Sequence, residues 1–434
     1  MSIDQFLLSA DTTDLNFPEI RPTLDLNFSK TKTLDPRITF TRSSGGSYVG
    51  SDGLIKYAGV NQPRFDHDPV TGESLGLLVE ENRTNLLTNT ETFDSGWTKT
   101  NTSSITTNAI TSPDGNLTAA KFNYNFADLG ILRRTVGYAP STTYTVSAFL
   151  KAAEIKYVIF LILDNQFGGV SSMRINLVTG EFLDGVKNLP STRTLTYYGN
   201  GWYRAAITFT TTINPSPSSY FDFRPSDVWP PRNIGGPINN PFRGQGFYIW
   251  GTQLEIGDCL TSYIPTTTST RSRASEVVLL SGNNFLDIFN ENEGVFFSKS
   301  KTLGIVSEAF VGAVNTVPSS LTAYIDILRY QSGEMRAVIC PGIRSNCAVI
   351  NSSLPLGKVY KSTHAYNLNK SVLFVDGNQI GEINSPSRIV PDNLKILTIG
   401  NSRPNGPFNL NGHIYQLMYY NRLLPDDQLK ALTH

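Results

Sequence analysis

Short runs in which apolar and polar residues alternate recur along this chain, and they limit its fold more than any other feature. Clear examples are residues 143–150, 172–177 and 202–210, where apolar side chains occupy every second position. In a β-strand such side chains share one face, which must then be buried. Turn-forming stretches such as residues 113–115 and 199–201 separate the runs. Many short strands at this spacing predict an all-β protein built from antiparallel sandwiches.

The composition limits the function as well as the fold. At 434 residues the chain is long enough for two or three domains. Its 36 basic residues equal its 36 acidic residues, so it lacks the basic surface that nucleic-acid binding requires. A net charge of zero also leaves little repulsion between copies, which permits self-association.

Few residues point to a metal site or a disulfide framework. The three cysteines are too few for a framework in a chain of this length. Cys340 and Cys347 could pair across a hairpin, but we expect small buried side chains instead. No CxxC pattern or His/Cys cluster suggests zinc, so we predict no metal and no cofactor. His364 and His413 lie in expected strands, and we expect them to be core or surface polar residues rather than catalytic ones.

The sequence contains neither a signal peptide nor a membrane span that we can identify. Its first residues lack a basic segment followed by an apolar one. No apolar run approaches the length of about 20 residues that a membrane helix needs. A protein made in a cytoplasm, including one assembled there into a virus particle, fits both observations.

Three stretches resemble a module that recurs in structural proteins of tailed bacteriophages. They are SLGLLVEENRTNLL (residues 74–87), GWYR (201–204) and IWGTQLEIGDCLTSYIPT (249–266). The segments LDLNF (24–28), LDPRITFTRSSGGSYV (34–49) and PRFDHDPVTGE (63–73) look like the leader that usually precedes this module. The resemblance implies a jelly roll similar to a carbohydrate-binding module, and such modules occur in fibres, spikes and head-attached proteins.

The last part of the chain resembles a different family. LFVDGNQIGEI (373–383), LTIGNS (397–402) and GHIYQLMYYNRLLPDDQLKAL (412–432) are similar to concanavalin A-like or laminin-G-like sandwiches. The dipeptide Asp376-Gly377 between two alternating runs is also a strong hairpin signal. Pro425 favours the start of a short helix near the C-terminus.

These observations divide the chain into four expected parts. Residues 1–22 form an extended arm, which we expect to dock on another virion protein or a neighbouring subunit, or alternatively to pack on its own domain. Residues 23–76 form a small β-region, and residues 77–270 form the jelly roll, in which an apolar strand ends at Gly251. After Pro265 a linker-like segment leads into the lectin-like sandwich of residues 271–434.

One long insertion, residues 213–246, is the candidate binding site. Loops of this length inside a compact domain are uncommon and often functional. Aromatic rings stack on the apolar faces of sugars, and polar side chains pair with their hydroxyl groups. The candidate carbohydrate-binding residues are therefore Tyr220, Phe223, Arg224, Asp227, Trp229 and Arg232. Subunit contact and local packing are the alternatives for this loop, whereas Trp97, Trp202 and Trp250 are expected in the core.

The sequence offers weak support for catalysis. A glycan hydrolase needs two carboxyl groups roughly 5 to 10 Å apart, and the sequence cannot place Asp222, Asp227, Glu80, Glu81 or Glu255 at that distance. In PRFDHDP, Asp66 and Asp68 would share a strand face from which His67 points away, so a polar turn is the simpler interpretation. No GxSxG, HExxH or P-loop pattern is present.

The sequence therefore predicts a non-enzymatic structural protein of a tailed-phage virion. It would be a fibre, or a decoration of the head, neck or tail, that attaches to host-surface glycans. By analogy with phage fibres, we expect a homo-oligomer, with a trimer favoured. A glycan-degrading tailspike and a passive reinforcement of the capsid or neck are the two alternatives.

Overall fold

The computed structural model describes most of the chain. It covers residues 20–100, 103–124, 130–165, 169–226, 229–230, 244–304, 308–316, 323–331, 334–341, 347–355, 357–385, 390–403 and 408–434. Strands dominate these residues, every strand pair is antiparallel, and the helices are short, which confirms the all-β prediction. The described part contains no helix with the length and apolar character needed to cross a membrane.

The chain forms two compact units whose boundaries differ from the predicted domains. Unit 1 contains residues 1–42, 75–81 and 275–434, and unit 2 contains residues 43–74 and 82–274. The expected β-region of residues 23–76 is thus divided between the two units. Its first strand, β1 (Leu24–Leu26), pairs with β31 (Gly412–Tyr420) of unit 1, which no local pattern could indicate. Of the expected arm, residues 1–19 lie outside the described residues.

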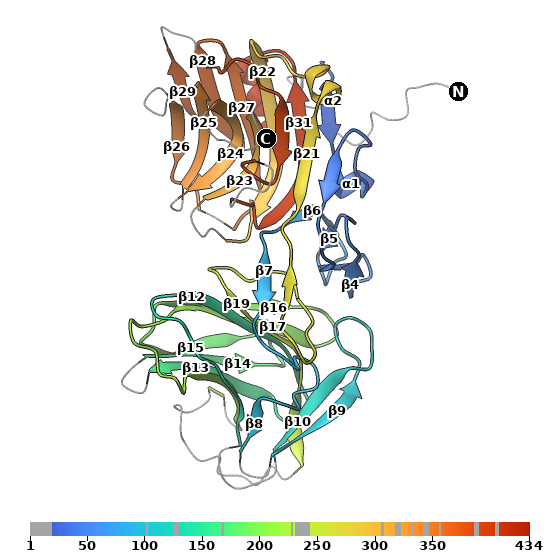
Figure 1. The fold of residues 1–434 in the computed structure, drawn as a ribbon, viewed down its shortest axis with the longest axis vertical. Coiled ribbons are helices and arrows are strands. Elements are labelled where there is room, and N and C mark those ends of the chain that lie inside the picture. The colour runs from blue at the N-terminus through green and yellow to red at the C-terminus, as the bar shows by residue number, and fades with distance from the viewer. Residues whose placement is uncertain are drawn as a thin grey trace, which may run out of the picture. The chain divides into compact units, whose positions relative to one another are not determined.

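Unit 1 is a sandwich of two sheets (Figure 1). One sheet has the order β29-β28-β27-β22-β31-β6, and β1 also pairs with β31. The other has the order β2-β21-β30-β23-β24-β25-β26. Their remaining strands are β2 (Thr39–Thr41), β6 (Ser74–Val79), β21 (Val277–Ser281), β22 (Glu293–Thr302), β23 (Glu308–Asn315), β24 (Ala323–Gln331), β25 (Glu334–Pro341), β26 (Ala348–Ser352), β27 (Tyr360–Asn367), β28 (Lys370–Val375), β29 (Asn378–Asn384) and β30 (Ile396–Ile399).

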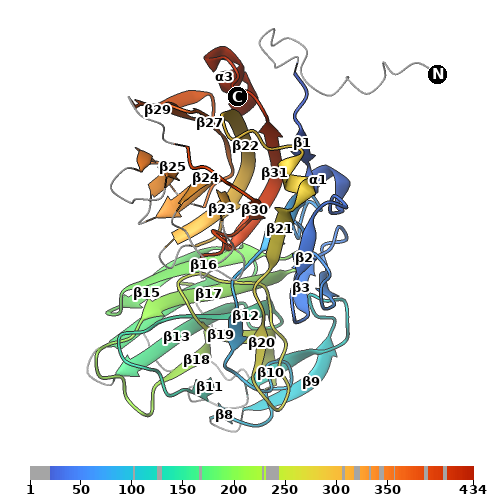
Figure 2. The ribbon, with the colours of Figure 1, turned by 45° about the horizontal axis from the view of Figure 1, so that its top comes forward.

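The short helices of unit 1 are α1 (Phe28–Thr31), α2 (Asn283–Leu286) and α3 (Asp426–Thr433). Helix α3 begins after Pro425, as predicted, and lies against β27 and β28 (Figure 2). Its Leu429 and Leu432 pack on the outward-facing apolar side chains of that sheet, including Phe297 and Met418. The helix thereby buries a sheet face that would otherwise remain exposed.

A buried histidine joins the two sheets of unit 1. His364 on β27 is fully buried, and its Nδ1 lies 2.5 Å from the carbonyl oxygen of Asp326 on β24. Its Nε2 lies 3.0 Å from the hydroxyl of Ser371. Burial disfavours the charged imidazolium and lowers the pKa of His364 to about 4. This position agrees with the expectation that His364 is a core or surface polar residue rather than a catalytic one.

The cysteine prediction was wrong for one pair. Cys340 and Cys347 form a disulfide, and their Cα atoms are 4.3 Å apart. Antiparallel pairing of β25 with β26 brings the two residues together, which their spacing in the sequence does not reveal. Cys259 is outside any disulfide and is buried, as expected of a small core side chain, and its Sγ accepts a hydrogen bond from Arg83 Nη2.

Unit 2 is a second sandwich of two sheets (Figure 2). The first sheet has the order β16-β17-β12-β19-β10-β9 and the second β15-β14-β13-β18-β11-β8. Their strands are β8 (Trp97–Lys99), β9 (Ser104–Ile110), β10 (Ala119–Tyr124), β11 (Leu132–Thr135), β12 (Thr143–Ala152), β13 (Tyr157–Asn165), β14 (Gly169–Asn176), β15 (Phe182–Lys187), β16 (Ser191–Tyr197), β17 (Trp202–Thr210), β18 (Tyr220–Ser226) and β19 (Gln245–Ile256). Smaller strands of the unit are β3 (Gly46–Val49), β4 (Ile55–Ala58), β5 (Phe65–His67), β7 (Arg83–Asn85) and β20 (Arg271–Arg273).

Strand β19 runs through the predicted end at Gly251. Gly251 and Thr252 of β19 both lie opposite Ala148 of β12, so β19 carries a β-bulge. Gly251 has a φ of 58°, and a Cβ there would lie 3.0 Å from the Phe149 ring. Glycine therefore marks a bulge inside the strand and not its end. The expected linker after Pro265 is also partly a strand, because β20 pairs with β7.

Two apolar clusters cover both sides of the first sheet of unit 2. The larger lies between the sheets and includes Trp97 and Phe223. The smaller lies on the outer side and contains Phe149, Trp202 and Trp250 together with Ile55 and Tyr263. The prediction that Trp97, Trp202 and Trp250 are core residues is confirmed.

We predict that His364 makes unit 1 sensitive to acid. The folded-state pKa lies below the ordinary value of 6.5, so the unfolded chain binds the proton first. The stabilisation is therefore complete above pH 6.5 and is lost as the pH falls toward 4, by about 2 kcal/mol between pH 7.5 and pH 5. Urea unfolding followed by far-UV circular dichroism at both pH values measures this loss, and His364→Gln should reduce it.

The exposed C-terminal His434 provides the control, since His434→Gln should keep the full pH dependence. All four tryptophans lie in unit 2, so tryptophan fluorescence follows that unit separately. An unchanged pH dependence in His364→Gln would contradict the prediction.

Candidate functional site

The outward side of the second sheet of unit 2 holds the candidate site. On β13, Val158, Phe160 and Ile162 point into the core, so Tyr157, Ile159 and Leu161 point outward. The register of β13 with β18 places Ser226, Arg224 and Asp222 opposite these outward residues. Arg133 of β11 lies opposite Asp222, and Arg174 of β14 lies opposite Ile159. We call this side of the sheet the outer face.

Part of the predicted loop is a strand of this sheet. Residues 220–226 form β18, which pairs with both β11 and β13, so the loop prediction was wrong for this segment. The segment has the alternation of a strand, with Phe221 and Phe223 in the core. Pro215, Pro217 and Pro225 close to it suggested an irregular loop.

Three of the six predicted site residues lie on or next to the outer face, but not at one place: Tyr220 is opposite Leu163 at one end of β13, whereas Trp229 lies beside Tyr157 at the other end, about 20 Å away. Tyr220 and Arg224 are on the outer face, and Trp229 follows β18, with its ring 5.7 Å from the Tyr157 ring at an angle of 33°. Phe223 is fully buried and stacks on Phe160 between the sheets, so it is not presented to a ligand. Asp227 and Arg232 lie outside the described residues.

Asp222 is the electrostatic centre of the outer face. Its Oδ1 accepts a hydrogen bond from Arg224 Nε at 2.8 Å, and its Oδ2 accepts one from Arg224 Nη2 at 3.0 Å. Oδ2 also accepts from Nε and Nη2 of Arg133, at 3.2 and 2.9 Å. Burial lowers the pKa of Arg224, but the hydrogen bonds and charge of Asp222 outweigh it, so that the pKa is raised.

Sequence reasoning missed Arg133 and Tyr157. The guanidinium carbon of Arg133 lies 3.5 Å from the centre of the Tyr220 ring, a cation–π contact. Tyr157, Tyr220 and Trp229 are each half-buried, so each presents part of a ring. The signal that could have found both residues is strand alternation, because each is next to an apolar residue of the core, Arg133 to Leu132 and Tyr157 to Val158.

This arrangement suits binding better than acid–base catalysis. The Asp222 carboxylate is fully buried and is bound by two arginines through four N–H donors. A general acid must carry a proton that it can release to a substrate. The Asp222 carboxylate instead holds both arginines in place through these four hydrogen bonds.

Other carboxylates considered for catalysis also have structural partners. Glu255 is fully buried and accepts hydrogen bonds from the backbone N–H and hydroxyl of Thr261. Asp66 accepts from the backbone N–H of Val49, and His67 contacts the carbonyl of the same residue. Asp66 and His67 are buried in strand β5, so the polar-turn interpretation was wrong for them, and it holds only for Asp68, which accepts from the backbone N–H groups of Val70 and Thr71.

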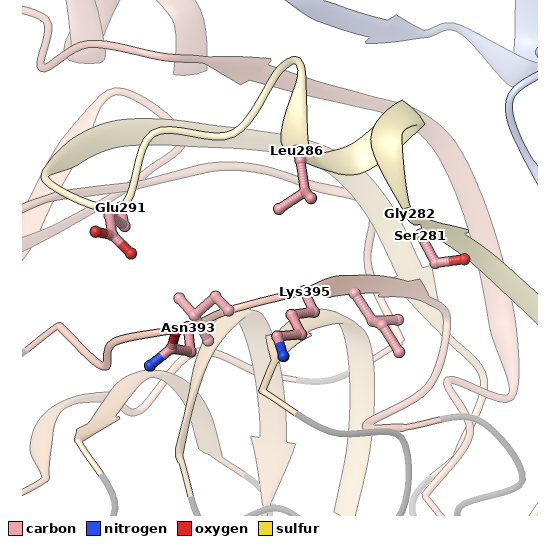
Figure 3. Close-up of a pocket in the computed structure, with 8 residues that line it drawn as sticks. Ser281, Gly282, Leu286, Glu291, Asn393 and Lys395 are labelled. Atoms are coloured by element: carbon pink, nitrogen blue, oxygen red, sulfur yellow. The ribbon is translucent and has the colours of Figure 1, made fainter.

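Unit 1 contains a cavity of about 430 Å³ beside helix α2 (Figure 3). Leu286 and Glu291 lie on one side of it, and Asn393 and Lys395 lie on the other. Ser281, Gly282, Leu394 and Ile396 complete the lining. The lining contains no aromatic ring on which a sugar could stack. Among the described residues, no group of three or more His, Cys, Asp or Glu side chains is placed to hold a metal ion.

Comparison with known proteins gives no family. No family model matches the sequence, and no curated protein matches it. Solved structures match over part of the chain. The IT-sialidase CBM40 of Ruminococcus gnavus is 14% identical, with a TM-score of 0.31, over 34% of this chain and 86% of its own length.

Two further solved structures are similar to the same low degree. Domain 4 of the GH43 extracellular arabinanase AbnA from Geobacillus stearothermophilus, solved with arabinotriose, has 12% identity and a TM-score of 0.30. That match covers 40% of this chain and 82% of the domain. The NanB sialidase from Streptococcus pneumoniae has 12% identity and a TM-score of 0.31, over 36% of this chain and 26% of that one. At these TM-scores none of the likenesses supports an argument about ligands.

We predict that Asp222 stabilises unit 2 by neutralising buried arginine. In Asp222→Asn, Arg224, whose side chain is 6% exposed, keeps its charge without a counter-ion. Leaving one member of a buried ion pair unpaired should lower the free energy of unfolding by about 3 kcal/mol. Urea unfolding followed by tryptophan fluorescence measures the change.

Asp52 is the matched control, because its ion pair with Lys56 leaves the two side chains 50% and 40% exposed. Asp52→Asn should change the stability by less than about 1 kcal/mol. Equal effects of the two substitutions would show that the buried pair does not stabilise the unit.

Proposed function

We propose that this chain is a non-enzymatic structural protein of a tailed-phage particle that attaches to host-surface glycans through the outer face of unit 2. The observation that carries the glycan part is a row of half-buried rings along the outer face, with Tyr220 beside Arg133 at one end of β13 and Tyr157 beside Trp229 at the other. The sequence resemblance described above supports the phage part. The particle position that we favour is a fibre or a decoration of the head, neck or tail.

The two outward sides of the unit 2 sandwich support the choice of this face. The outer side of the first sheet carries the apolar cluster of Phe149, Trp202 and Trp250, all buried within the unit. On the outer face of the second sheet, Asp222 and Arg224 are also buried, but the rings of Tyr157, Tyr220 and Trp229 and the side chain of Arg133 are partly exposed. Binding sites commonly combine apolar surface with a few well-placed polar groups, and here the outer face provides both.

The proposal also includes two kinds of binding partner, other virion proteins and further copies of this chain. Residues 1–22 would bind other virion proteins, and copies of the chain would associate, with a trimer favoured by analogy with phage fibres. Light scattering of the purified protein reports the oligomer. Deletion of residues 1–22 should leave that oligomer folded but prevent its incorporation into particles.

We predict that the purified protein binds host-surface glycans and that Tyr157→Ala and Trp229→Ala weaken binding about tenfold or more. Each substitution removes ring surface that a bound sugar would bury. A glycan array followed by calorimetry on the strongest ligand measures the effect. Tyr197→Ala is the matched control, since Tyr197 is 40% exposed on β16 of the other sheet.

The same samples separate this function from its alternatives. Release of reducing sugar from host polysaccharide would favour a glycan-degrading tailspike. The absence of any glycan signal, together with particles that fall apart without the protein, would favour passive reinforcement. Either result would overturn the proposal of a glycan-binding protein without catalysis.

A further inference from the structure

Arg133 on the outer face has a fixed position. Its Nε and Nη2 donate to Asp222, and its guanidinium carbon lies 3.5 Å from the centre of the Tyr220 ring. A guanidinium held on one edge and covered on one face keeps few alternative rotamers. The entropic cost of ordering this long side chain is therefore largely met before any ligand arrives.

Part of the donor set of Arg133 is still unused. Of its five N–H donors, the contacts with Asp222 engage those of Nε and Nη2. No described residue accepts a hydrogen bond from Nη1, and the side chain is 27% exposed. The face thus presents N–H donors of a permanently charged group to solvent.

Arg224 contrasts with Arg133 in this respect. Its Nε and Nη2 donate to the same carboxylate, but its side chain is only 6% exposed. The two arginines share one aspartate, so the carboxylate neutralises the buried guanidinium and leaves a positive charge at the exposed one.

The outer face also has an excess of positive charge. Among the described residues of β11, β13, β14 and β18, the outward positions include Arg133, Arg174 and Arg224 against the carboxylate of Asp222. The chain as a whole has equal numbers of basic and acidic residues. A local excess on a neutral chain favours ligands of negative charge.

We propose that the outer face binds an acidic glycan, with the carboxylate of a sugar acid accepting hydrogen bonds from Arg133 Nη1. This assignment rests on the proposed glycan-binding function and names the class of sugar. Arg133, which lies beside Tyr220, selects the charged group, and the rings of Tyr157 and Trp229 toward the other end of β13 contact sugar rings further along the oligosaccharide. Charge-assisted hydrogen bonds from arginine to carboxylate are stronger than those between neutral groups, which gives the face its preference.

The test compares acidic oligosaccharides with their neutral counterparts. The ligand pairs are an oligogalacturonide with its carboxyl-reduced form, and sialyllactose with lactose. We expect at least one acid to bind about 10- to 100-fold more tightly than its neutral partner. The pair that shows the difference distinguishes a uronic acid from a sialic acid. The preference should fall as salt is raised.

Variants assign the preference to Arg133. Arg133→Gln should remove the discrimination between acid and neutral sugar, whereas Tyr157→Ala should weaken both by the same factor. Arg133→Lys keeps the charge but lacks the planar fork and should recover only part of the preference. Arg134→Gln is the matched control, because Arg134 is the next residue but bonds to Ser95 and Thr88 instead.

The outcomes test two claims separately: that the outer face binds a glycan, and that Arg133 gives it a preference for an acidic one. Equal binding of acidic and neutral partners would overturn the acidic-glycan assignment while leaving glycan binding intact. No binding of any glycan would overturn the proposed function itself. A preference that persists in folded Arg133→Gln would place the anion elsewhere on the protein and would also overturn the assignment.

Discussion

A buried hydrogen-bond network around Asn85 closes unit 2 by joining β7, near the start of its sandwich, to residues 252–264 near the end. The rest of the unit depends on this network. The Asn85 amide donates to the carbonyls of Thr252 and Ile264 and accepts from the backbone of Leu254 and Leu87. Gln253 accepts from Ile264 and donates to Glu255, which in turn holds Thr261. A buried polar network with its members satisfied fixes one arrangement of the chain, because every alternative leaves costly unpaired groups. The motifs that resemble phage proteins therefore include the residues of this closure.

This explains why the motifs identify a fold more readily than a function. The side chains of Asn85, Gln253 and Glu255 are fully buried, so they are not presented to a ligand. The outer face lies on strands β11, β13, β14 and β18, outside those motifs. Residues of the outer face can therefore change without breaking the buried network around Asn85.

The sequence predicted those strands whose alternation is complete within the strand itself. Residues 202–210 were predicted as a strand and form β17, because every second side chain there is apolar. The segment of β18 was assigned to a loop, since nearby prolines outweighed a short alternation of apolar and polar residues.

Contacts between residues far apart in the sequence could not be predicted in this way. Arg133 and Asp222 are 89 positions apart, and no local sequence pattern indicates that they pair. The Cys340–Cys347 bond and the pairing of β1 with β31 depend on register in the same way. Local periodicity thus determines which segments are strands, whereas the site depends on which strands become neighbours.

The shared aspartate also limits the geometry of any anion on the outer face. Asp222 already occupies the edge of Arg133 formed by Nε and Nη2, and the Tyr220 ring lies against one face of the guanidinium. An incoming carboxylate must therefore approach Nη1 from the remaining side and cannot form the paired contact through Nε and Nη2. The interaction that stabilises the buried Arg224 is thus the same one that orients the exposed Arg133. Removing Asp222 would free the edge of Arg133 formed by Nε and Nη2 but would also remove the contact that fixes its position, so stability and selectivity on this face are linked through one carboxylate.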